Sequence, residues 1–456
     1  MEPAARSAAA QAVATDLLID GLSVAAAGAS HAGPRLLAGW ALEQGSRPVA
    51  TLIGHGRRVA AVDAARANGA AMHVLDYEPM WNPANHSLST VLPAVLALAE
   101  WLAARPPARA RPTGADLLAA VVIGIEAQQR VRTASSQFEP GELMFHPPGA
   151  VGAFGSAAAC GQLLGMDART LTQALGIAAS RVGGVQANTG SMTKALHCGQ
   201  AAMAGLEAAL LAARGFTADD DALGHPRGYG RAFYGARFEP AALLARRAAP
   251  FLLEPGPAFK YFPSQYGSHF VIVAALAARA ELAGVRSAEI AAVRIVAPAM
   301  TYTDRPRPAS GLDGKFSFQY VAAIALLDGK VDVASFADVR RFSADVEQLL
   351  PRIVIDVDPA REGRFDRMRV DVIVTTAGGR EARGACDGPP GIWGRPAPAG
   401  RLAAKAADCL SELLDEAAAD AFLVRARSFP TLSADAVCEL LAVLGTPHAT
   451  AQATAR

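Results

Sequence analysis

One short stretch of the chain, DYEPMWNPANHS, combines an acid and an imidazole in a segment that cannot form regular secondary structure. Asp76 can give or take a proton, and so can His86 ten residues later. Pro79 and Pro83 exclude a regular helix and a central strand, because proline lacks a backbone N–H and has a fixed φ. The stretch is therefore predicted to be a shaped loop that holds two proton-transfer groups.

Three further segments place cations, amides and imidazoles among glycine and proline. FHPPGAVG has His146 before the start of a glycine-rich helix, whose free backbone N–H groups are predicted to bind a carboxylate. VQANTGSMTKALHCG carries Lys194 and His197 between two apolar helices. FKYFPSQYGSH carries Lys260 and Gln265 where the character of the chain changes. Together these groups predict chemistry on a small anion.

Each of these groups also has a simpler interpretation. A single His or Lys in a loop is more often solvated than catalytic, by about two to one. Lys194 and Lys260 stand out because lysine is sparse beside arginine in this chain. His197 lies three residues after Lys194 and is expected to share a helical face with it and orient it. Turn or capping roles are the first interpretation for three polar neighbours: Gln186, Asn188 and Thr189.

The composition excludes several classes of function. The 456 residues predict two or three domains, and an apolar share of 52% with 19% charged residues is typical of a globular protein. The net charge of +1, with acids and bases interspersed, leaves no footprint for nucleic acid or an anionic membrane. The sequence motifs of nucleotide binding, GxGxxG and GxxxxGK[ST], are absent, as are GxSxG and HExxH. A cofactor-independent reaction is therefore predicted.

The cysteines and the N-terminal segment bear on the compartment. Five scattered cysteines show no CxxC pair and no metal-ligand spacing, which is typical of reduced thiols and predicts no metal site. The N-terminal segment has Glu2 and is interrupted by Asp16 and Asp20, unlike a signal peptide. No apolar run is expected to reach the roughly 18 to 20 residues that span a bilayer. The prediction is a cytoplasmic protein.

The elements that must position these groups are mostly helices. From residue 7 to about 250, apolar residues recur at three- and four-residue spacing with breaks at Gly or Pro. β-Branched, partly alternating segments begin near residue 285, and the Gly378–Gly379 pair predicts a hairpin. The prediction is a mainly α protein: an all-α domain over 1–259, an inserted smaller α+β lid domain over 260–392, and helices over 393–456 that complete the first domain.

Several motifs in order resemble the MmgE/PrpD family, which includes 2-methylcitrate dehydratase, cis-aconitate decarboxylase and an iminodisuccinate epimerase. They run nearly from end to end of the chain: DLLIDGLSVAAAGAS, ARANGAAMHVLDYEP, FHPPGAVGAFGSAAACGQLLGM, GSMTKALHCGQAAMAGLEAALLAARGF, GYGRAFYG, KYFPSQYGSH and KFSFQYVAAIALLDGKV. The resemblance implies a large all-α domain with a smaller α+β lid, a homodimer, and cofactor-free chemistry on small di- or tricarboxylates. The active site is then expected between the two domains.

Carried over residue by residue, the resemblance predicts a site. Asp76, His86, Lys194 and Lys260 match catalytic positions, with the two lysines neutralising charge and Asp76 or His86 transferring the proton. The residues predicted to contact the substrate are Met80, His146, His197 and Gln265.

The chain also departs from the family at two of these positions. The usual D-F-D-D-T reads D-Y-E-P-M here, so Pro79 replaces an acid and Met80 replaces the threonine. Gln265 stands where the cis-aconitate decarboxylase has a histidine. Losing a hydroxyl and an imidazole removes hydrogen bonds to a carboxylate, and an unpaired buried polar group costs about 1–3 kcal/mol. These departures argue against that decarboxylase activity and favour a substrate with an apolar group, or one fewer carboxylate, near Met80.

The predicted function is a lyase of the dehydratase or hydratase type that acts on a small di- or tricarboxylic acid through proton transfer next to a carboxylate. An isomerase or epimerase on the same scaffold is the second interpretation, because the same deprotonated intermediate serves both. A non-catalytic carboxylate-binding protein is the third, favoured by the altered loop.

Overall fold

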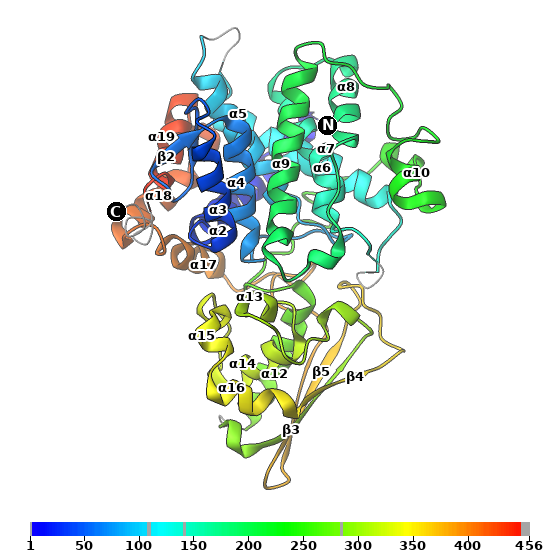
Figure 1. Ribbon diagram of the computed structural model, residues 1–456, viewed down its shortest axis with the longest axis vertical. Helices are drawn as coiled ribbons and strands as arrows, with labels where there is room; N and C mark the ends of the chain where they lie inside the picture. Colours follow the sequence, from blue (N-terminus) through cyan, green and yellow to red (C-terminus); the bar gives the residue numbers. More distant parts are fainter. Residues whose placement is uncertain (1, 107–110, 140–142, 283–285, 448–456) are drawn as a thin grey trace.

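The computed structural model describes residues 2–106, 111–139, 143–282 and 286–447. Two lobes are stacked along the long axis of the molecule (Figure 1). The larger lobe is helical, and the smaller lobe combines helices with a twisted sheet, so the predicted mainly α class with a smaller α+β part is confirmed.

Helices make up almost all of the larger lobe, and most run roughly along its long axis (Figure 1). The helices of the larger lobe that precede the smaller one are α1 (Glu2–Ala5), α2 (Ala8–Gly28), α3 (Ala32–Glu43), α4 (Ala61–Val74), α5 (Leu88–Ala103), α6 (Gly114–Ala134), α7 (Pro147–Leu163), α8 (Ala168–Ala179), α9 (Met192–Ala212), α10 (Tyr229–Tyr234) and α11 (Ala241–Leu244). The chain returns to it through α17 (Arg401–Leu410), α18 (Glu416–Arg427) and α19 (Ala434–Leu444). A buried apolar cluster joins α2, α5 and α6 to these last helices, so the two ends of the chain share one core.

The larger lobe also contains a hairpin that the sequence periodicity does not predict. Strand β1 (Ala50–Leu52) pairs antiparallel with β2 (Arg57–Val59) across a tight turn. The expectation of helix throughout residues 7–250 is wrong here, because strands of three residues are too short to show an alternating pattern. The side chain of Glu100 on α5 accepts from the Thr51 N–H at 2.8 Å and secures the hairpin against the helices.

Small residues bring the helices that carry the site close together. A Cβ on Gly199 of α9 would lie 2.1 Å from the Arg66 carbonyl oxygen of α4, and one on Gly205 would lie 2.4 Å from the Ala153 oxygen of α7. Only glycine permits such backbone contact. The alanine- and glycine-rich composition therefore holds α4, α7 and α9 in direct backbone contact, as the scarcity of large side chains predicts.

The smaller lobe is built on a sheet of four strands in the described part of the chain. The strand order is β4 (Ile353–Val357), β3 (Ile290–Ala297), β5 (Val370–Thr376) and β6 (Glu381–Cys386), with β3 and β4 parallel and the other pairs antiparallel. The predicted hairpin joins β5 to β6 through Gly379, whose φ is +77°. Its helices are α12 (Tyr266–Glu281), α13 (Gly311–Gly314), α14 (Phe318–Asp328), α15 (Asp338–Arg341) and α16 (Ala344–Leu349).

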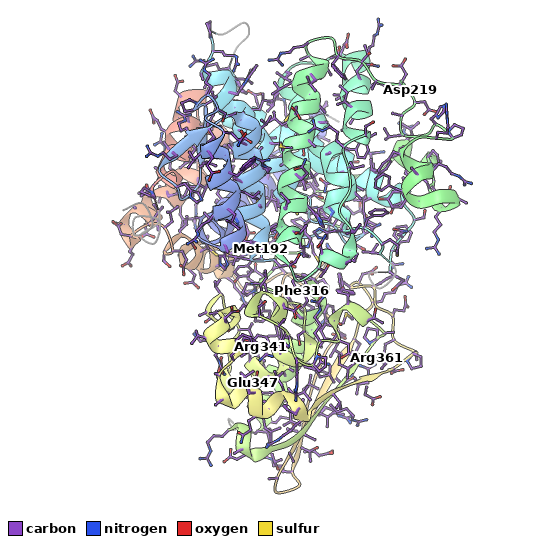
Figure 2. All side chains as sticks on the ribbon, in the orientation of Figure 1. Met192, Asp219, Phe316, Arg341, Glu347 and Arg361 are labelled. Carbon is purple, nitrogen blue, oxygen red and sulfur yellow. The ribbon has the colours of Figure 1, made fainter. Side chains whose placement is uncertain are left out.

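Helices α12 and α14 give this lobe its own core. Their apolar residues pack with the sheet in a buried cluster that extends from Ala258 to Ile392 and includes Met80 from the opening loop. Figure 2 places Phe316 where the two lobes meet, and Arg341 and Glu347 inside the smaller lobe. The pairing of Arg341 with Glu347 joins α15 to α16.

Helix α2 corrects one sequence-based expectation. Its 21 residues are long and apolar enough to cross a bilayer by length and composition, so the expectation that no segment is long enough is wrong. Most of the helix is buried inside the protein, and its Asp20 pairs with Lys405 of α17 at 2.6 Å. Buried core helices of globular proteins meet the same two criteria, so this finding is weak support for a membrane span.

Candidate functional site

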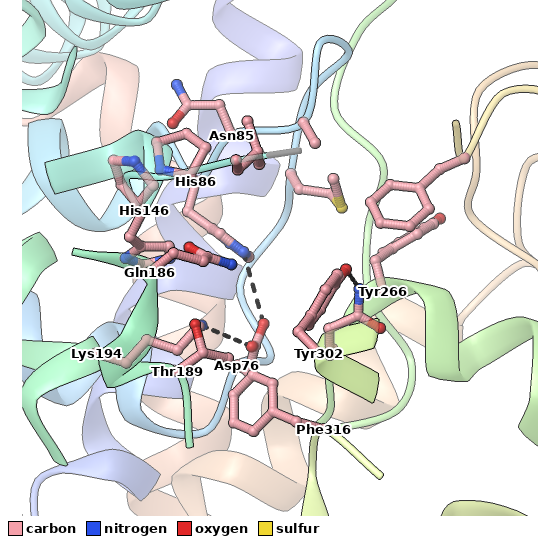
Figure 3. A pocket seen from close by; sticks show the side chains of 17 residues that line it. Asp76, Asn85, His86, His146, Gln186, Thr189, Lys194, Tyr266, Tyr302 and Phe316 are labelled. Carbon is pink, nitrogen blue, oxygen red and sulfur yellow. Dashed lines mark hydrogen bonds and ion pairs between the residues drawn. The ribbon is translucent and has the colours of Figure 1, made fainter. Parts of the chain in front are cut away.

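A pocket opens where the two lobes meet, with about 510 Å³ of empty space including its open mouth. Figure 3 shows Lys194 and His146 on one side of it and Tyr266 and Tyr302 on the other. Its lining comprises Asp76, Met80, Ala84, Asn85, His86, Leu143, His146, Pro147, Pro148, Gln186, Thr189, Lys194, Gln265, Tyr266, Tyr302, Phe316 and Phe365. Six of the eight residues predicted for the site belong to it; Lys260 and His197 do not.

Asp76 occupies the turn that ends α4. Its φ of +50° is left-handed, a conformation that costs a non-glycine residue about 1–2 kcal/mol, and its N–H donates to the His73 carbonyl oxygen at 2.8 Å. The turn aims the carboxylate between two buried ammonium groups. Lys194 donates to Oδ2 at 2.8 Å, and Lys260 donates to Oδ1.

The electrostatics of this cluster keep Asp76 ionised. Burial alone would raise the pKa of the Asp76 carboxyl. Lys194 and Lys260 outweigh burial and, with smaller contributions from His86 and His73, hold this pKa well below its usual value of 3.8. A carboxylate held in this way accepts hydrogen bonds and orients cations rather than releasing a proton near neutral pH.

Glu78 and His73 form a second buried layer behind Asp76. The Glu78 side chain accepts from Ser89 Oγ at 2.9 Å and from His73 Nδ1. His73 Nε2 faces the Lys194 ammonium at 2.7 Å, so the tautomer with its proton on Nδ1 satisfies both partners. Burial lowers the pKa of His73 to about 4, which is consistent with this neutral form. Lys194 is therefore held by His73 and Asp76 together.

His86 lies between the two carboxylates. Its Nδ1 is 3.3 Å from Glu78 Oε1, and its Nε2 is 3.6 Å from Asp76 Oδ1. Burial, opposed by Glu78, lowers the pKa of His86. The neutral imidazole can accept a proton, and the flanking carboxylates stabilise the imidazolium that results. His86 thus has the surroundings of a general base in a pocket wall.

His197 does not orient Lys194 as the helical spacing suggests. Both lie on α9, but His197 Nδ1 faces His146 Nδ1 at 3.3 Å, and His73 from α4 takes the place beside Lys194. Burial and the nearby Lys194 lower the pKa of His197 to about 4. The expectation of an orienting role for His197 is therefore wrong, because a residue from another helix lies closer.

The start of α7 does not present free N–H groups. Pro147 and Pro148 have none, and the N–H groups of Gly149 and Ala150 both donate to the His146 carbonyl oxygen, at 3.0 and 3.2 Å. The predicted backbone carboxylate site at this helix start is therefore wrong. His146 itself lines the pocket, and burial together with Lys194 lowers its pKa well below 6.5.

Lys260 lies beneath Asp76 and out of the pocket lining. Its side chain is fully buried, and its ammonium donates to the Asp76 carboxylate, to the Asp76 carbonyl oxygen at 2.9 Å and to the Ser264 oxygen at 3.2 Å. Burial lowers the pKa of Lys260, and Asp76 opposes this shift. Lys260 is thus placed to act on a ligand through Asp76 rather than by contact.

The two departures from the family pattern lie in the wall that the smaller lobe contributes to. Met80 exchanges backbone hydrogen bonds with Ala258 at 3.1 and 2.7 Å and is buried in the core of that lobe. Gln265 caps α12 by accepting from the Ser268 N–H at 3.0 Å, and its amide donates to Tyr302 Oη at 2.7 Å. The Tyr302 hydroxyl accepts this bond and can still donate its own proton into the pocket.

Sequence reasoning misses or undervalues several residues of this site. Gln186 and Thr189, interpreted as turn residues, line the pocket, and both present a buried oxygen without a partner in the described part of the chain. Such atoms are available to a ligand. His73 and Glu78 were present in the quoted motif ARANGAAMHVLDYEP. Phe316 was likewise present in the motif KFSFQYVAAIALLDGKV, whereas no sequence signal pointed to Tyr302.

Among the described residues of this site, two groups of side chains could in principle bind a metal cation. His73, Glu78 and His86 bring ligand atoms within 4.8 Å of one another, and so do His73, His146 and Cys198. Both sets use His73, whose two nitrogens already face Glu78 and the Lys194 ammonium. A metal on His73 would therefore have to break the bond to Glu78 at Nδ1 or displace the Lys194 ammonium at Nε2, which makes the site a poor fit for a resident ion.

Comparisons with known proteins cover most of the chain. The MmgE/PrpD N-terminal domain matches residues 2–241, and the MmgE/PrpD C-terminal domain matches residues 262–429. The chain is 36% identical over 338 residues to the cis-aconitate decarboxylase of Homo sapiens, covering 73% of this chain and 69% of that protein. It is 35% identical to the protein of the same name from Mus musculus, over 73% of this chain and 68% of that protein. Identity to the one from Aspergillus terreus is 27%, over 63% of this chain and 61% of that protein.

Proposed function

Because the chain belongs to the MmgE/PrpD family, we propose that it is a lyase that acts on a small tricarboxylic acid, without a cofactor, by proton transfer at a carbon next to a carboxylate. The observation that carries the proposal is the buried arrangement of Lys194 and Asp76 beside His86 in the pocket between the lobes, with Lys260 paired to Asp76 from outside the lining. The cis-aconitate decarboxylases among its relatives support a tricarboxylic substrate.

Substrate carboxylates need hydrogen-bond donors and positive charge. Lys194 lines the pocket with its ammonium, and Thr189 and Tyr302 add hydroxyl groups. Gln186 adds an amide. These groups converge on the same space from both lobes, so a ligand with several carboxylates would contact both. Lys260 supplies a second positive charge from below, through Asp76.

His86 is the proposed proton-transfer group. In a dehydration, its neutral imidazole removes the proton from the carbon next to a carboxylate, and the electron pair moves into that carboxylate as an enediolate. The enediolate collapses to a double bond as hydroxide leaves the neighbouring carbon, and the imidazolium returns a proton to make water. Lys194 neutralises the charge that develops on the carboxylate. Asp76 stabilises the imidazolium.

Decarboxylation is a second candidate, favoured by the names of the relatives. Here the bond between carbon and a carboxylate breaks, carbon dioxide leaves, and the electron pair remains on carbon. A protonated His86 then supplies the proton to that carbon. Met80 and Gln265 favour a substrate other than cis-aconitate, so dehydration is proposed first. Epimerisation needs only the first proton removal and its reversal from the other face.

A homodimer in the cytoplasm is the proposed state of the protein. The support on this chain is an apolar surface on and beside α3, where Leu36 and Trp40 are 65% and 52% exposed and Met192 is 46% exposed. Gly33 of α3 lies against Met192, so the three side chains belong to one face. Sedimentation equilibrium of the wild type and of Trp40→Glu tests this: dissociation by the charge supports the dimer, and a monomeric wild type refutes it.

The activity itself is tested by proton NMR of the protein in D₂O with citrate, 2-methylcitrate, cis-aconitate, malate and iminodisuccinate. Loss of a C–H signal with a new vinyl resonance and no carbon dioxide supports dehydration. A vinyl product with carbon dioxide released supports decarboxylation. Deuterium uptake without a new skeleton indicates an epimerase. Thermal stabilisation by an acid that shows neither change, across the panel, overturns the lyase and indicates a binding protein.

A further inference from the structure

The lysines of this chain are concentrated around one loop. The chain has five, Lys194, Lys260, Lys315, Lys330 and Lys405, and all lie in the described residues. Lys330 is exposed and pairs with Asp332 at 2.7 Å. The other four are buried and point at the turn around Asp76 or at its carboxylate. In a chain that uses arginine for almost all its other cations, this placement needs a specific reason.

Three of these lysines donate hydrogen bonds to three successive backbone carbonyl groups. Lys315 donates to the Leu75 oxygen at 3.1 Å, and Lys260 donates to the Asp76 oxygen at 2.9 Å. Lys405 donates to the Tyr77 oxygen at 2.8 Å. The three side chains are 4% exposed or less. We call Lys260, Lys315 and Lys405 the lysine cradle.

The other bonds of the lysine cradle anchor the turn to separate parts of the fold. Lys315 also donates to the Pro263 oxygen at 2.7 Å, and Lys260 donates to the neighbouring Ser264 oxygen at 3.2 Å, both in the segment that leads into the smaller lobe. Lys405 pairs with Asp20 of α2 in the core of the larger lobe. The turn is thus tied from one side to the smaller lobe and from the other to a core helix.

Overall stability does not explain Lys315. Its ammonium has carbonyl partners but no carboxylate partner among the described residues. Burial lowers the pKa of Lys315 to about 7, with Asp76 opposing. A buried cation without a counterion destabilises a fold, and an apolar side chain of similar length would fill the space at lower cost. An ammonium also serves this spot better than a guanidinium, since it is compact and its three donors can converge on crowded carbonyls.

We propose that Lys315 and Lys405 are positioning residues that, together with Lys260, fix the carbonyl groups of residues 75–77 and thereby hold the Asp76 carboxylate in its left-handed turn between Lys194 and His86. The effect on turnover rests on the proposed function. The effect on the geometry of the loop does not, because the lysine cradle restrains the backbone whether or not a reaction follows.

The variant Lys315→Met tests the proposal, with Lys330→Met as its matched control. Hydrogen exchange is followed at the Asp76 and Met80 amides, which donate to His73 and Ala258. Both amides are expected to exchange at least about tenfold faster in Lys315→Met, and kcat on the best acid of the panel to fall about 10- to 100-fold with KM changed less than about threefold. The urea midpoint is expected to be unchanged or higher, which a merely stabilising lysine would not give. Lys330→Met is expected to match the wild type in every measurement.

A second variant tests the same proposal in case Lys315→Met does not fold. Asp20→Asn with Lys405→Met removes both members of the buried pair, so neither charge is stranded, and it is expected to loosen the same amides. Amide exchange and kcat like those of Lys330→Met in both variants would overturn the proposal. Faster exchange in a protein whose wild type turns over no acid would overturn the proposed function and leave the lysine cradle standing.

Discussion

The two walls of the pocket differ in almost every property. The polar wall (Asp76, His86, His146 and Lys194) comes from the larger lobe and consists of ionisable groups held by a second buried layer. The apolar wall (Met80, Tyr266, Phe316 and Phe365) belongs to or packs with the smaller lobe and consists of large carbon surfaces. One wall is organised by charge and the other by shape.

This difference indicates that the polar wall serves the proton transfer and the apolar wall serves the selection of the ligand. Buried charges cost stability unless each is paired, so the polar wall is retained for what it does rather than for what it stabilises. Apolar side chains stabilise the fold wherever they are buried, and their shape selects among ligands without taking part in proton transfer. Chemistry is expected to fail when the polar wall is changed, and selectivity to shift when the apolar wall is changed.

The strongest test of this comparison removes the charge that organises the polar wall. Asp76→Asn keeps the shape but leaves Lys194 and Lys260 as buried cations without a carboxylate partner. The free energy of unfolding is expected to fall by about 3–5 kcal/mol and kcat by more than about a thousandfold. Urea titration and steady-state kinetics measure the two effects. A variant as stable as the wild type would show that the two ion pairs do not organise this wall.

His86→Ala separates chemistry from stability within the polar wall. A general base contributes about 10²–10⁴-fold, so kcat is expected to fall by that amount. The side chain is 13% exposed, and its loss is expected to cost less than about 1 kcal/mol of stability. His225→Ala, outside the pocket lining, is the control. Normal turnover from folded His86→Ala protein would remove His86 from the mechanism.

Acid is expected to act on the polar wall through two imidazoles that contact it, His73 and His197. The pKa values of His73 and His197 are lowered to about 4, whereas an unfolded histidine titrates near 6.5. Unfolding therefore takes up protons between these values, so the stability that the neutral rings provide is complete above pH 6.5 and is lost as the pH falls toward 4. Each proton that unfolding takes up lowers the free energy of unfolding by about 1.4 kcal/mol for every pH unit of acidification.

Urea midpoints between pH 4 and 8 measure this slope. His197→Asn removes one of the two buried imidazoles and is expected to make the slope shallower. At still lower pH, unfolding also takes up protons at Asp76 and Glu78, because their pKa values are depressed in the folded protein, and this acts in the same direction. A stability that stays flat down to pH 4.5 would contradict the prediction.

The smallest effect is expected from Met80 of the apolar wall together with Gln265, which lines the pocket next to Tyr266 in the chain. Met80→Thr with Gln265→His restores the residue types of the family pattern at the two departures. Selectivity for cis-aconitate over an acid with an alkyl group is expected to rise about 10- to 100-fold. The reason is that a hydroxyl and an imidazole hydrogen-bond to a carboxylate but are left unpaired beside an alkyl group. The ratio of kcat/KM for the two acids measures it, with Phe365→Leu as a volume control. An unchanged ratio would mean that this wall does not select the substrate.

Much of the site could be predicted from residue types and motif order. Asp76, His86, His146 and Lys194 meet in one pocket as predicted, and so do Met80 and Gln265. The catalytic and binding roles assigned to them stay predictions until the variants are measured. Lys260 and His197 were predicted beside them but lie outside the lining, because a position in sequence does not tell which end of a buried side chain faces a cavity.

Other features were beyond a sequence argument. The neighbour of Lys194 is His73, which lies 121 positions away, and not His197 on the same helix. Pro147 and Pro148 lack N–H groups, so the helix that follows His146 does not offer the free donors that a helix start usually provides. The short hairpin at Ala50–Val59 lacks any periodic signal.

The sequence by itself determined the helical periodicity, the loop at Asp76, the change to strands near residue 285 and the family pattern of reactive residues, because each depends on local spacing and residue type. Only the tertiary structure decided which charged and polar groups become partners. Three buried lysines from distant segments meet three successive carbonyls, and two more residues, His73 and Glu78, form the layer behind Asp76. Such partners are chosen by long-range packing, where burial makes every unpaired charge costly and only the folded backbone brings the pairing groups together.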